Sequence, residues 1–290
     1  MRDRALGQIA PPIAALAILL GLWEALTRAF EVRAFLLPPP SAIAKVAWVK
    51  REALLLGAFT TFREAFAGFA LSVVFGVLAA IVLSSSRLVE RAFYPYTLFL
   101  QTVPIVAIAP LFVVWFGPGF RAVAVAAFIV SVFPVIANTL TGIHSVDPAL
   151  RDLFKLYGAG RGATLVKLTL PSALPHIVTG LRIASGLAVI GAIVGDMVAG
   201  FAEDAPGLGI LVMTAFKQFE TDLLFAAVLM STALGIVLFG AVNLAGARVL
   251  RRWHPSEKTD PPDGSSDTTS KDARTQIGRA PLDPLERSDP

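Results

Sequence analysis

The chain has 290 residues, of which 55% are hydrophobic and only 16% charged, and its mean hydropathy is +0.70. An ordinary water-soluble domain carries more charge on its surface, so this class is disfavoured. The sequence contains no cysteine, which excludes disulfides, thiolate metal sites and cysteine nucleophiles, and its 3 histidines lie too far apart to predict a metal cluster.

Long stretches with few charged residues predict membrane-spanning helices, because a bilayer core about 30 Å thick is crossed by roughly 20 helical residues. Six such segments follow one another along the chain: 9–26, 65–83, 92–120, 122–143, 177–200 and 223–247. The first could also be a cleaved signal peptide, but no small-x-small cleavage site follows it. We therefore expect an all-α, polytopic membrane protein with about six spans.

Two short helices are predicted in the connections outside the spans. Pro38, Pro39 and Pro40 end one segment, and Ser41 can cap an interfacial helix that follows it. The connection after the fifth span has one apolar helical face that begins at Gly207 and consists of Leu208, Leu211, Val212, Ala215, Phe216 and Phe219. This second helix is either a gate beneath a docked binding protein or a plain interfacial helix.

The distribution of basic residues predicts the orientation of the spans, since Lys and Arg are enriched in cytoplasmic loops. Most loop basic residues fall on the side of the two termini, although the connection between the first two spans is also basic. We expect both termini in the cytoplasm. Residues 254–290 are acidic and rich in proline, which predicts a disordered tail behind a permease domain of residues 1–253.

The connection between the fourth and fifth spans, about residues 144–175, is long for a helix link and predicts a structure of its own. Leu150, Leu153, Phe154 and Tyr157 recur at helical spacing and form an apolar stripe. Gly158 can adopt a positive φ, so we expect a helix, a glycine turn and a second helix. An apolar stripe in the cytosol predicts a protein partner.

This connection resembles the EAA loop of permease subunits of bacterial binding-protein-dependent ABC importers. That loop has Glu-Ala-Ala, three residues, Gly, nine residues and Ile-x-Leu-Pro. Here the Glu-Ala-Ala positions are Asp152, Leu153 and Phe154, the glycine is Gly158, and the final positions are 168–171. The spacing is kept but the alanines are not, and the bulkier side chains imply a differently shaped partner groove.

The resemblance covers roughly residues 15–252 and is closest to the branch that imports nitrate, sulfonates, taurine and thiamine-pyrimidine precursors. Other landmarks are Leu22-Trp23-Glu24, Pro38-Pro39-Pro40-Ser41, Ala109-Pro110-Leu111, Trp115-Phe116-Gly117, Gly180-Leu181-Arg182 and Gly207-Leu208-Gly209. It implies the type I ABC importer permease fold. The residues implied to contact the ATPase are Asp152, Leu153, Phe154, Tyr157, Gly158, Ala159, Leu170 and Pro171.

The same resemblance implies the partners. A separate cytoplasmic ATPase would bind ATP, since this chain has no G-x-x-x-x-G-K-[ST] phosphate loop, and no catalytic residue, cofactor or metal is predicted in the chain itself. A periplasmic or lipid-anchored solute-binding protein would deliver the solute, and a second copy of the chain would complete a homodimer in the inner membrane. No nucleic acid is expected. The alternative is a stand-alone secondary transporter or channel, which needs no ATPase.

Polar residues inside the spans mark a candidate translocation path, namely Gln101, Thr102, Asn138 and Asp196. Hydrogen bonds between helices are the alternative for the uncharged residues, and a buried backbone or arginine partner is the alternative for Asp196. Gly191 and Gly195 form a G-x-x-x-G pair, which permits close approach of another helix. Packing within one subunit and a dimer seam explain that pair equally well.

Overall fold

The computed structural model describes residues 2–200 and 206–253, with residues 2–9 and 252–253 described only as parts of helices. The predicted disordered tail, 254–290, and the acidic residues Glu203 and Asp204 lie outside this range. Within the described residues the chain is all helical and has no strand, which confirms the predicted fold class. The helices are α1 (Arg2–Ala29), α2 (Pro40–Val49), α3 (Arg51–Ser84), α4 (Arg87–Thr102), α5 (Ile105–Phe116), α6 (Phe120–His144), α7 (Pro148–Leu156), α8 (Arg161–Thr164), the π-helical turn η1 (Leu165–Thr169), α9 (Leu170–Ala199), α10 (Leu208–Lys217) and α11 (Thr221–Trp253).

In the part of the chain that the structure describes, five unbroken helical segments are long and apolar enough to cross a membrane, and they include most of the predicted spans. They are residues 10–29 of α1, α3, α6, the continuous helix Arg161–Ala199, and residues 221–251 of α11. The predicted span 92–120 is wrong as a single helix, because α4 and α5 form a pair bent by 99°. Pro104 has no N–H to continue the helix, and Val103 before it is extended with ψ 123°.

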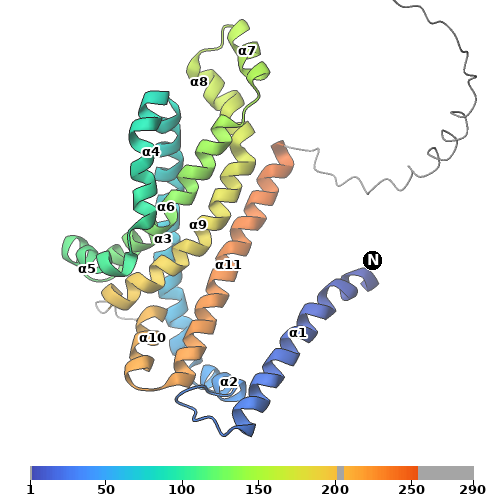
Figure 1. Cartoon of the computed structure of the whole chain (residues 1–290), viewed down its shortest axis with the longest axis vertical. Coiled ribbons are helices and arrows are strands. Elements are labelled where there is room, and N and C mark those ends of the chain that lie inside the picture. Colours follow the sequence, from blue (N-terminus) through green and yellow to red (C-terminus); the bar gives the residue numbers. More distant parts are fainter. Residues whose placement is uncertain (1, 201–205, 254–290) are drawn as a thin grey trace, which may run out of the picture. The chain divides into compact units, whose positions relative to one another are not determined.

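Helix α6 lies at the centre of the bundle, with α3 and α9 packed along it (Figure 1). Small residues allow this close approach: a Cβ on Gly68 of α3 would lie 2.5 Å from the Cβ of Ala127, and a Cβ on Gly191 of α9 would lie 2.8 Å from the Cα of Ala127. A Cβ on Gly195 would meet Ala126 of the same helix. The G-x-x-x-G pair therefore packs against α6 within one subunit.

A buried pair of serines links α3 and α6 through their side chains. The hydroxyl oxygens of Ser72 and Ser131 are 2.6 Å apart, and Ser72 also donates to the carbonyl of Phe128 at 3.0 Å. This hydrogen bond between hydroxyl groups fixes α3 against α6 inside the bundle.

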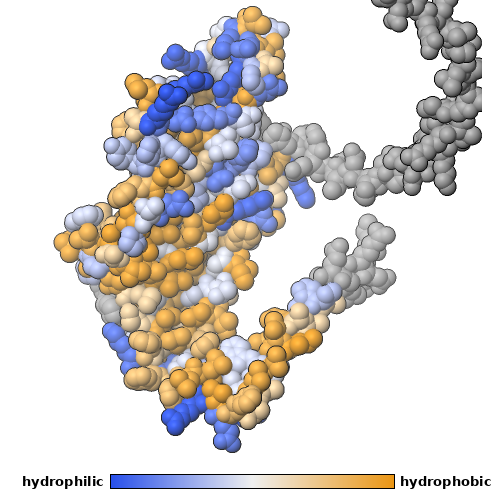
Figure 2. All heavy atoms as spheres, in the orientation of Figure 1, coloured by the Kyte–Doolittle hydropathy of each residue, from blue (hydrophilic) through white to orange (hydrophobic). Residues whose placement is uncertain are grey.

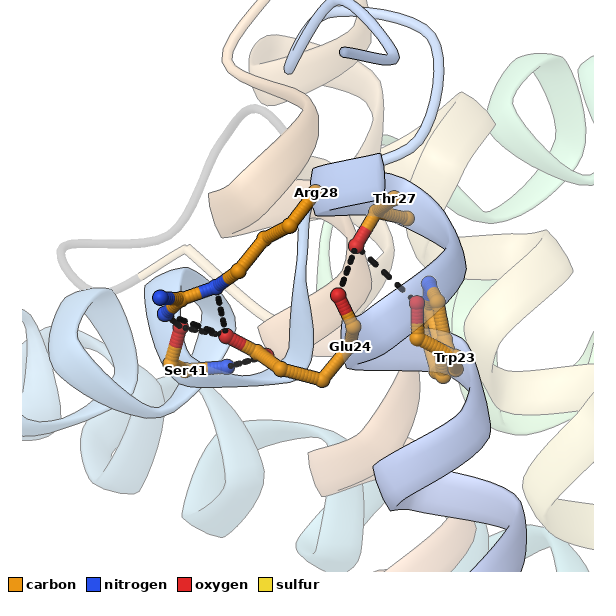
Figure 3. A network of polar contacts seen from close by, with 5 residues as sticks. All are labelled: Trp23, Glu24, Thr27, Arg28 and Ser41. Carbon is orange, nitrogen blue, oxygen red and sulfur yellow. Dashed lines mark hydrogen bonds and ion pairs between the residues drawn. The ribbon is translucent and has the colours of Figure 1, made fainter. Parts of the chain in front are cut away.

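Helix α1 lies apart from the bundle and contacts mainly α2 (Figure 1). Glu24 holds the two together, because its carboxylate accepts from the backbone N–H of Ser41 at 3.0 Å, from the Ser41 hydroxyl at 2.8 Å and from Nε of Arg28 at 2.7 Å (Figure 3). Ser41 was predicted to cap α2. The helix instead begins two residues earlier, with Pro39 as N-cap, and the Ser41 hydroxyl binds Glu24.

Hydrophobic side chains cover the middle of the bundle, whereas hydrophilic ones gather around α7 and α8 (Figure 2). Residues 10–22 of α1 are all exposed and almost entirely apolar. Exposing this much apolar surface to water is unfavourable, whereas contact with lipid tails in a bilayer favours it. The band of exposed apolar residues thus fits a membrane-embedded bundle, and it places α7 and α8 beyond one end of the spans.

Candidate coupling loop and polar sites

Helix α7 is a short, defined element between α6 and the next spanning helix. Asp147 caps its first turn, because its carboxylate accepts from the N–H of Ala149 at 2.8 Å, and Pro148 occupies the first position, where no N–H is needed. The helix ends in a turn at Gly158, whose φ is +69°. The N–H groups of Gly158 and Ala159 donate to the carbonyls of Lys155 and Phe154, both at 2.9 Å. The glycine turn expected from the sequence is present.

One side of α7 exposes large apolar side chains, which we call the α7 stripe: Leu153, Leu156 and Tyr157, exposed by 44%, 85% and 83%. Leu150 beside it is also exposed, while Phe154 is only half-exposed. Leu156 is absent from the predicted stripe even though it stands three residues after Leu153, a spacing that shares a helix face. The structure therefore gives Leu156, rather than Phe154, the prominent position.

Charged side chains occupy the rest of the α7 surface. Asp152 and Lys155 form an exposed ion pair of 2.9 Å, and the guanidinium of Arg151 donates to the carbonyl of Ile143 at the end of α6. These contacts place α7 in an aqueous environment, and Arg151 ties it to the spanning helix before it.

The second helix predicted after the glycine turn is present. The non-helical link ends at Gly160, and residues 161–175 form the first part of the continuous helix Arg161–Ala199. Leu170 and Pro171 start α9 immediately after the π-helical turn η1, where the N–H of Leu170 donates to the carbonyl of Leu165. Pro171 cannot donate to the carbonyl four residues earlier, and a widened turn absorbs this loss without breaking the helix.

The candidate path residues lie in three places. Gln101 and Thr102 are exposed at the end of α4, where the chain bends, and the Thr102 hydroxyl donates to the carbonyl of Phe99 at 2.9 Å. Asn138 is half-buried on α6 and donates to the carbonyl of Pro134 at 2.9 Å. No described hydrogen bond joins these residues to one another or to Asp196. Their role in the path stays a prediction.

Asp196 is almost fully buried, at 1% exposure, near the end of α9. Its Oδ2 accepts from the N–H of Gly209 at 2.9 Å and from the hydroxyl of Thr61 at 3.3 Å. The Thr61 oxygen in turn accepts from the N–H of Leu208 at 2.9 Å. We call Thr61, Asp196 and the first turn of α10 the Asp196 cluster. It supplies the backbone partner that was one of the two predicted alternatives for Asp196.

Sequence reasoning missed two members of this region. Thr61 and Glu64 are both fully buried on α3, one turn apart. Glu64 stands just before a charge-free stretch, and a carboxylate there suggested only the boundary of a span. The motif Gly207-Leu208-Gly209 is the sequence feature that could have indicated the cluster, because a side chain on either glycine would collide with Asp196 or with the α9 backbone.

Helix α10 turns most of the predicted apolar face toward the bundle and departs from it only at the last two residues. Leu208 and Ala215 are buried, whereas Phe216 is 66% exposed, and Phe219 lies beyond the helix with a φ of +58°. The first turn of α10 is held against α3 and α9 by the Asp196 cluster. Helix α10 is thus fixed to the bundle by this first turn and by Leu208, Leu211 and Val212, which pack in one apolar cluster with Ala226 and Ala227 of α11.

Residues 72–251 match the family described as binding-protein-dependent transport system inner membrane component. A probable ABC transporter permease protein of Haemophilus influenzae is 32% identical over 232 residues, which are 80% of this chain and 93% of that protein. The formylaminopyrimidine transport permease protein ThiX of Halalkalibacterium halodurans is 35% identical over 230 residues, 78% of this chain and 89% of that protein.

The fold agrees with these matches. A chain of the MetNI methionine ABC transporter, solved in inward-facing form, superimposes with a TM-score of 0.59 and 18% identity, covering 70% of this chain and 97% of that one. The matched region includes α7, the glycine turn and the Asp196 cluster apart from Thr61. The chain therefore belongs to the binding-protein-dependent transport system inner membrane component family, the multi-pass permease subunits of ABC importers.

Proposed function

We propose that this permease carries a small solute into the cell across the bacterial cytoplasmic membrane, driven by ATP hydrolysis on a separate ATPase subunit that binds α7. A solute-binding protein on the outer side delivers the solute, and two copies of the chain, with their termini in the cytoplasm, enclose the path. The family description, which names a binding protein, supports the outer partner. Family membership also removes the support for a stand-alone secondary transporter or channel.

The α7 stripe is the observation that carries the ATPase proposal. Exposed leucines are ordinary on a surface that faces lipid, but α7 lies outside the spans and beside Asp152 and Lys155, so water surrounds it. Leu156 and Tyr157 expose more than four fifths of their surface there. Adjacent, fully exposed apolar residues of this size on a polar element mark a protein interface.

Site-specific crosslinking tests this proposal. A photoreactive amino acid replaces Leu156 in the full chain, which is expressed in its host, irradiated and purified. The matched control carries the same group at Leu88, a leucine with 77% exposure at the start of α4. We expect position 156, and not position 88, to crosslink to a P-loop ATPase identified by mass spectrometry. Equal yields at both positions, or no ATPase adduct at position 156, would refute ATPase docking on α7.

We further infer that the solute belongs to the group of nitrate, sulfonates, taurine and thiamine-pyrimidine precursors. The 35% identity to ThiX, over most of both chains, supports this class. The solute-binding protein encoded beside this chain would be purified and its thermal unfolding followed with each of these solutes. Stabilisation by one of them is expected, and stabilisation only by an unrelated solute would refute the inference.

A further inference from the structure

A cavity of about 470 Å³ lies between α7, α8 and the adjacent ends of α3 and α6, and we call it the loop cavity. Three basic side chains line it, Arg151 and Lys155 from α7 and Arg161 from α8, together with the hydroxyl groups of Ser84 and Ser85 at the end of α3. None of its lining residues is acidic. The cavity is thus a basic, hydroxyl-bearing space where the loop meets the spans.

The basic groups of the loop cavity are only partly neutralised. Lys155 pairs with Asp152, which does not line the cavity, and Arg151 donates to the carbonyl of Ile143, which carries no full charge. Arg161 has no ion pair or hydrogen bond from its side chain in the part of the chain that the structure describes. An anion in this space would therefore meet a net positive charge.

The position of the loop cavity fits the depth of lipid headgroups. The apolar stretch of α3 ends at Leu83, directly before Ser84 and Ser85, and that of α6 ends at Ile143, which lines the cavity and is followed by His144 and Ser145. A span ends where the hydrocarbon core ends, so the next residues along the chain lie at the level of the phosphates. Basic pockets at this level recognise anionic headgroups.

The cavity uses the side of α7 opposite to the α7 stripe. At 100° per residue, Arg151 and Lys155 project within about 40° of each other, whereas the centre of the α7 stripe lies about 170° away from them. One short helix can therefore hold an anion on its inner face while its outer apolar face remains free for another protein. The basic residues have a structural role here beyond the retention of a loop in the cytoplasm.

We propose that the loop cavity binds the phosphate group of an anionic ligand, either a phospholipid headgroup or a soluble phosphate compound, through Arg161, Lys155 and Arg151. Arg and Lys form charge-assisted hydrogen bonds to phosphate oxygens, and the Ser85 hydroxyl adds a neutral donor, whereas that of Ser84 donates to the carbonyl of Ile81. A bound phosphate bridges α7 and α8 to the end of α3, and it thereby stiffens the segment that carries the α7 stripe. This binding does not depend on an ATPase or on the identity of the transported solute.

Binding is measured on the purified full chain in neutral detergent by thermal unfolding at constant ionic strength. The probes are short-chain phosphatidylglycerol, short-chain phosphatidylcholine and inorganic phosphate. The test variants are Arg161→Gln and the double variant Lys155→Gln with Arg161→Gln. The matched control replaces two basic residues on the same side that do not line the cavity, Lys167 and Arg248, by Gln.

We expect phosphatidylglycerol to stabilise the wild type and the control equally, and the double variant to need at least tenfold more ligand for the same shift. Inorganic phosphate acting in the same way would identify a soluble phosphate as the source, whereas an effect of the lipid alone would identify a headgroup. Phosphatidylcholine should stabilise the wild type only weakly, because its choline group would bring a positive charge into the basic cavity.

Three results would overturn the proposal: no stabilisation of the wild type by either phosphatidylglycerol or phosphate, equal stabilisation of the double variant, or equal action of phosphatidylcholine. The Arg161→Gln variant guards against misfolding, since it removes no side-chain hydrogen bond or ion pair within the described residues. Its unfolding temperature without ligand should match that of the wild type, while its ligand requirement rises at least threefold. An unchanged ligand requirement would likewise count against the cavity.

Discussion

Replacing Thr61 by Val tests whether the Asp196 cluster holds α10 on the bundle. Valine keeps the shape of threonine but removes the hydroxyl that donates to Asp196 and accepts from the N–H of Leu208. Leu208 is fully buried and its N–H is in the first turn of α10, where no helical carbonyl is available. The substitution therefore leaves a buried donor without its acceptor.

The size of this effect follows from the contacts that are lost. An orphaned buried N–H costs about 1–3 kcal/mol, and a hydrogen bond to a charged group is worth about 1.5–3 kcal/mol. The two costs sum to about 2.5–6 kcal/mol. Because Asp196 keeps its hydrogen bond from the N–H of Gly209, we expect a loss of stability in the lower half of this range, about 3 kcal/mol. Because 1.4 kcal/mol corresponds to a factor of ten, local opening of α10 should become roughly 100-fold more frequent.

Hydrogen exchange with mass spectrometry on the chain in nanodiscs measures this opening for residues 208–217. The matched control is Thr139→Val on α6, because Thr139 is also fully buried but its hydroxyl has no hydrogen-bond partner among the described residues. We expect about 100-fold faster exchange in α10 of Thr61→Val and unchanged exchange in Thr139→Val. Exchange in Thr61→Val within about twofold of the wild type would refute the reasoning.

Three further substitutions probe the coupling loop and the bundle. Leu156→Asp should weaken ATPase retention about 30-fold or more, because burying this 85% exposed leucine is worth about 2 kcal/mol, whereas Leu88→Asp should retain the ATPase in the same co-purification. Gly158→Val should abolish solute uptake at normal protein levels, since valine is strained at a φ of +69°. The control Gly160→Val should preserve uptake, because Gly160 has a φ of −67° and open space around its Cβ position. Loss of uptake in Gly160→Val but not in Gly158→Val would count against the turn. Gly191→Val should lower the unfolding temperature by roughly 5 °C, because its Cβ would press on the α6 backbone, and an unchanged temperature would contradict that close approach.

The positions of most spans along the chain could be predicted from the sequence, because crossing a membrane requires a minimum length of helix with few charges. The same rule failed at 92–120, where the missing N–H of Pro104 turns one apolar stretch into two helices. The glycine turn at Gly158 could also be predicted, since only local backbone chemistry decides it. These features depend on residues that are neighbours in the chain.

Contacts between distant residues were beyond the sequence alone. Thr61 and Asp196 are 135 residues apart, and nothing in either segment indicates that they meet. Nothing in the sequence indicated that Arg151, Lys155 and Arg161 line one cavity, because the rule of positive loops counts charges and ignores where side chains point. The exposure of Leu156 could not be predicted, because the spacing of the apolar residues in α7 is compatible with more than one helix face.

The continuous helix from Arg161 to Ala199 has a mechanical consequence. Its 39 residues at 1.5 Å each make a rod about 58 Å long, which is nearly twice the thickness of the hydrocarbon core. Its foot is joined to α7 through the glycine turn, and its far end carries Asp196, to which α10 is bonded. A tilt imposed at the foot therefore acts as a lever on α10 through one helix, whose hydrogen bonding is interrupted near the foot by the widened turn at η1 and by Pro175.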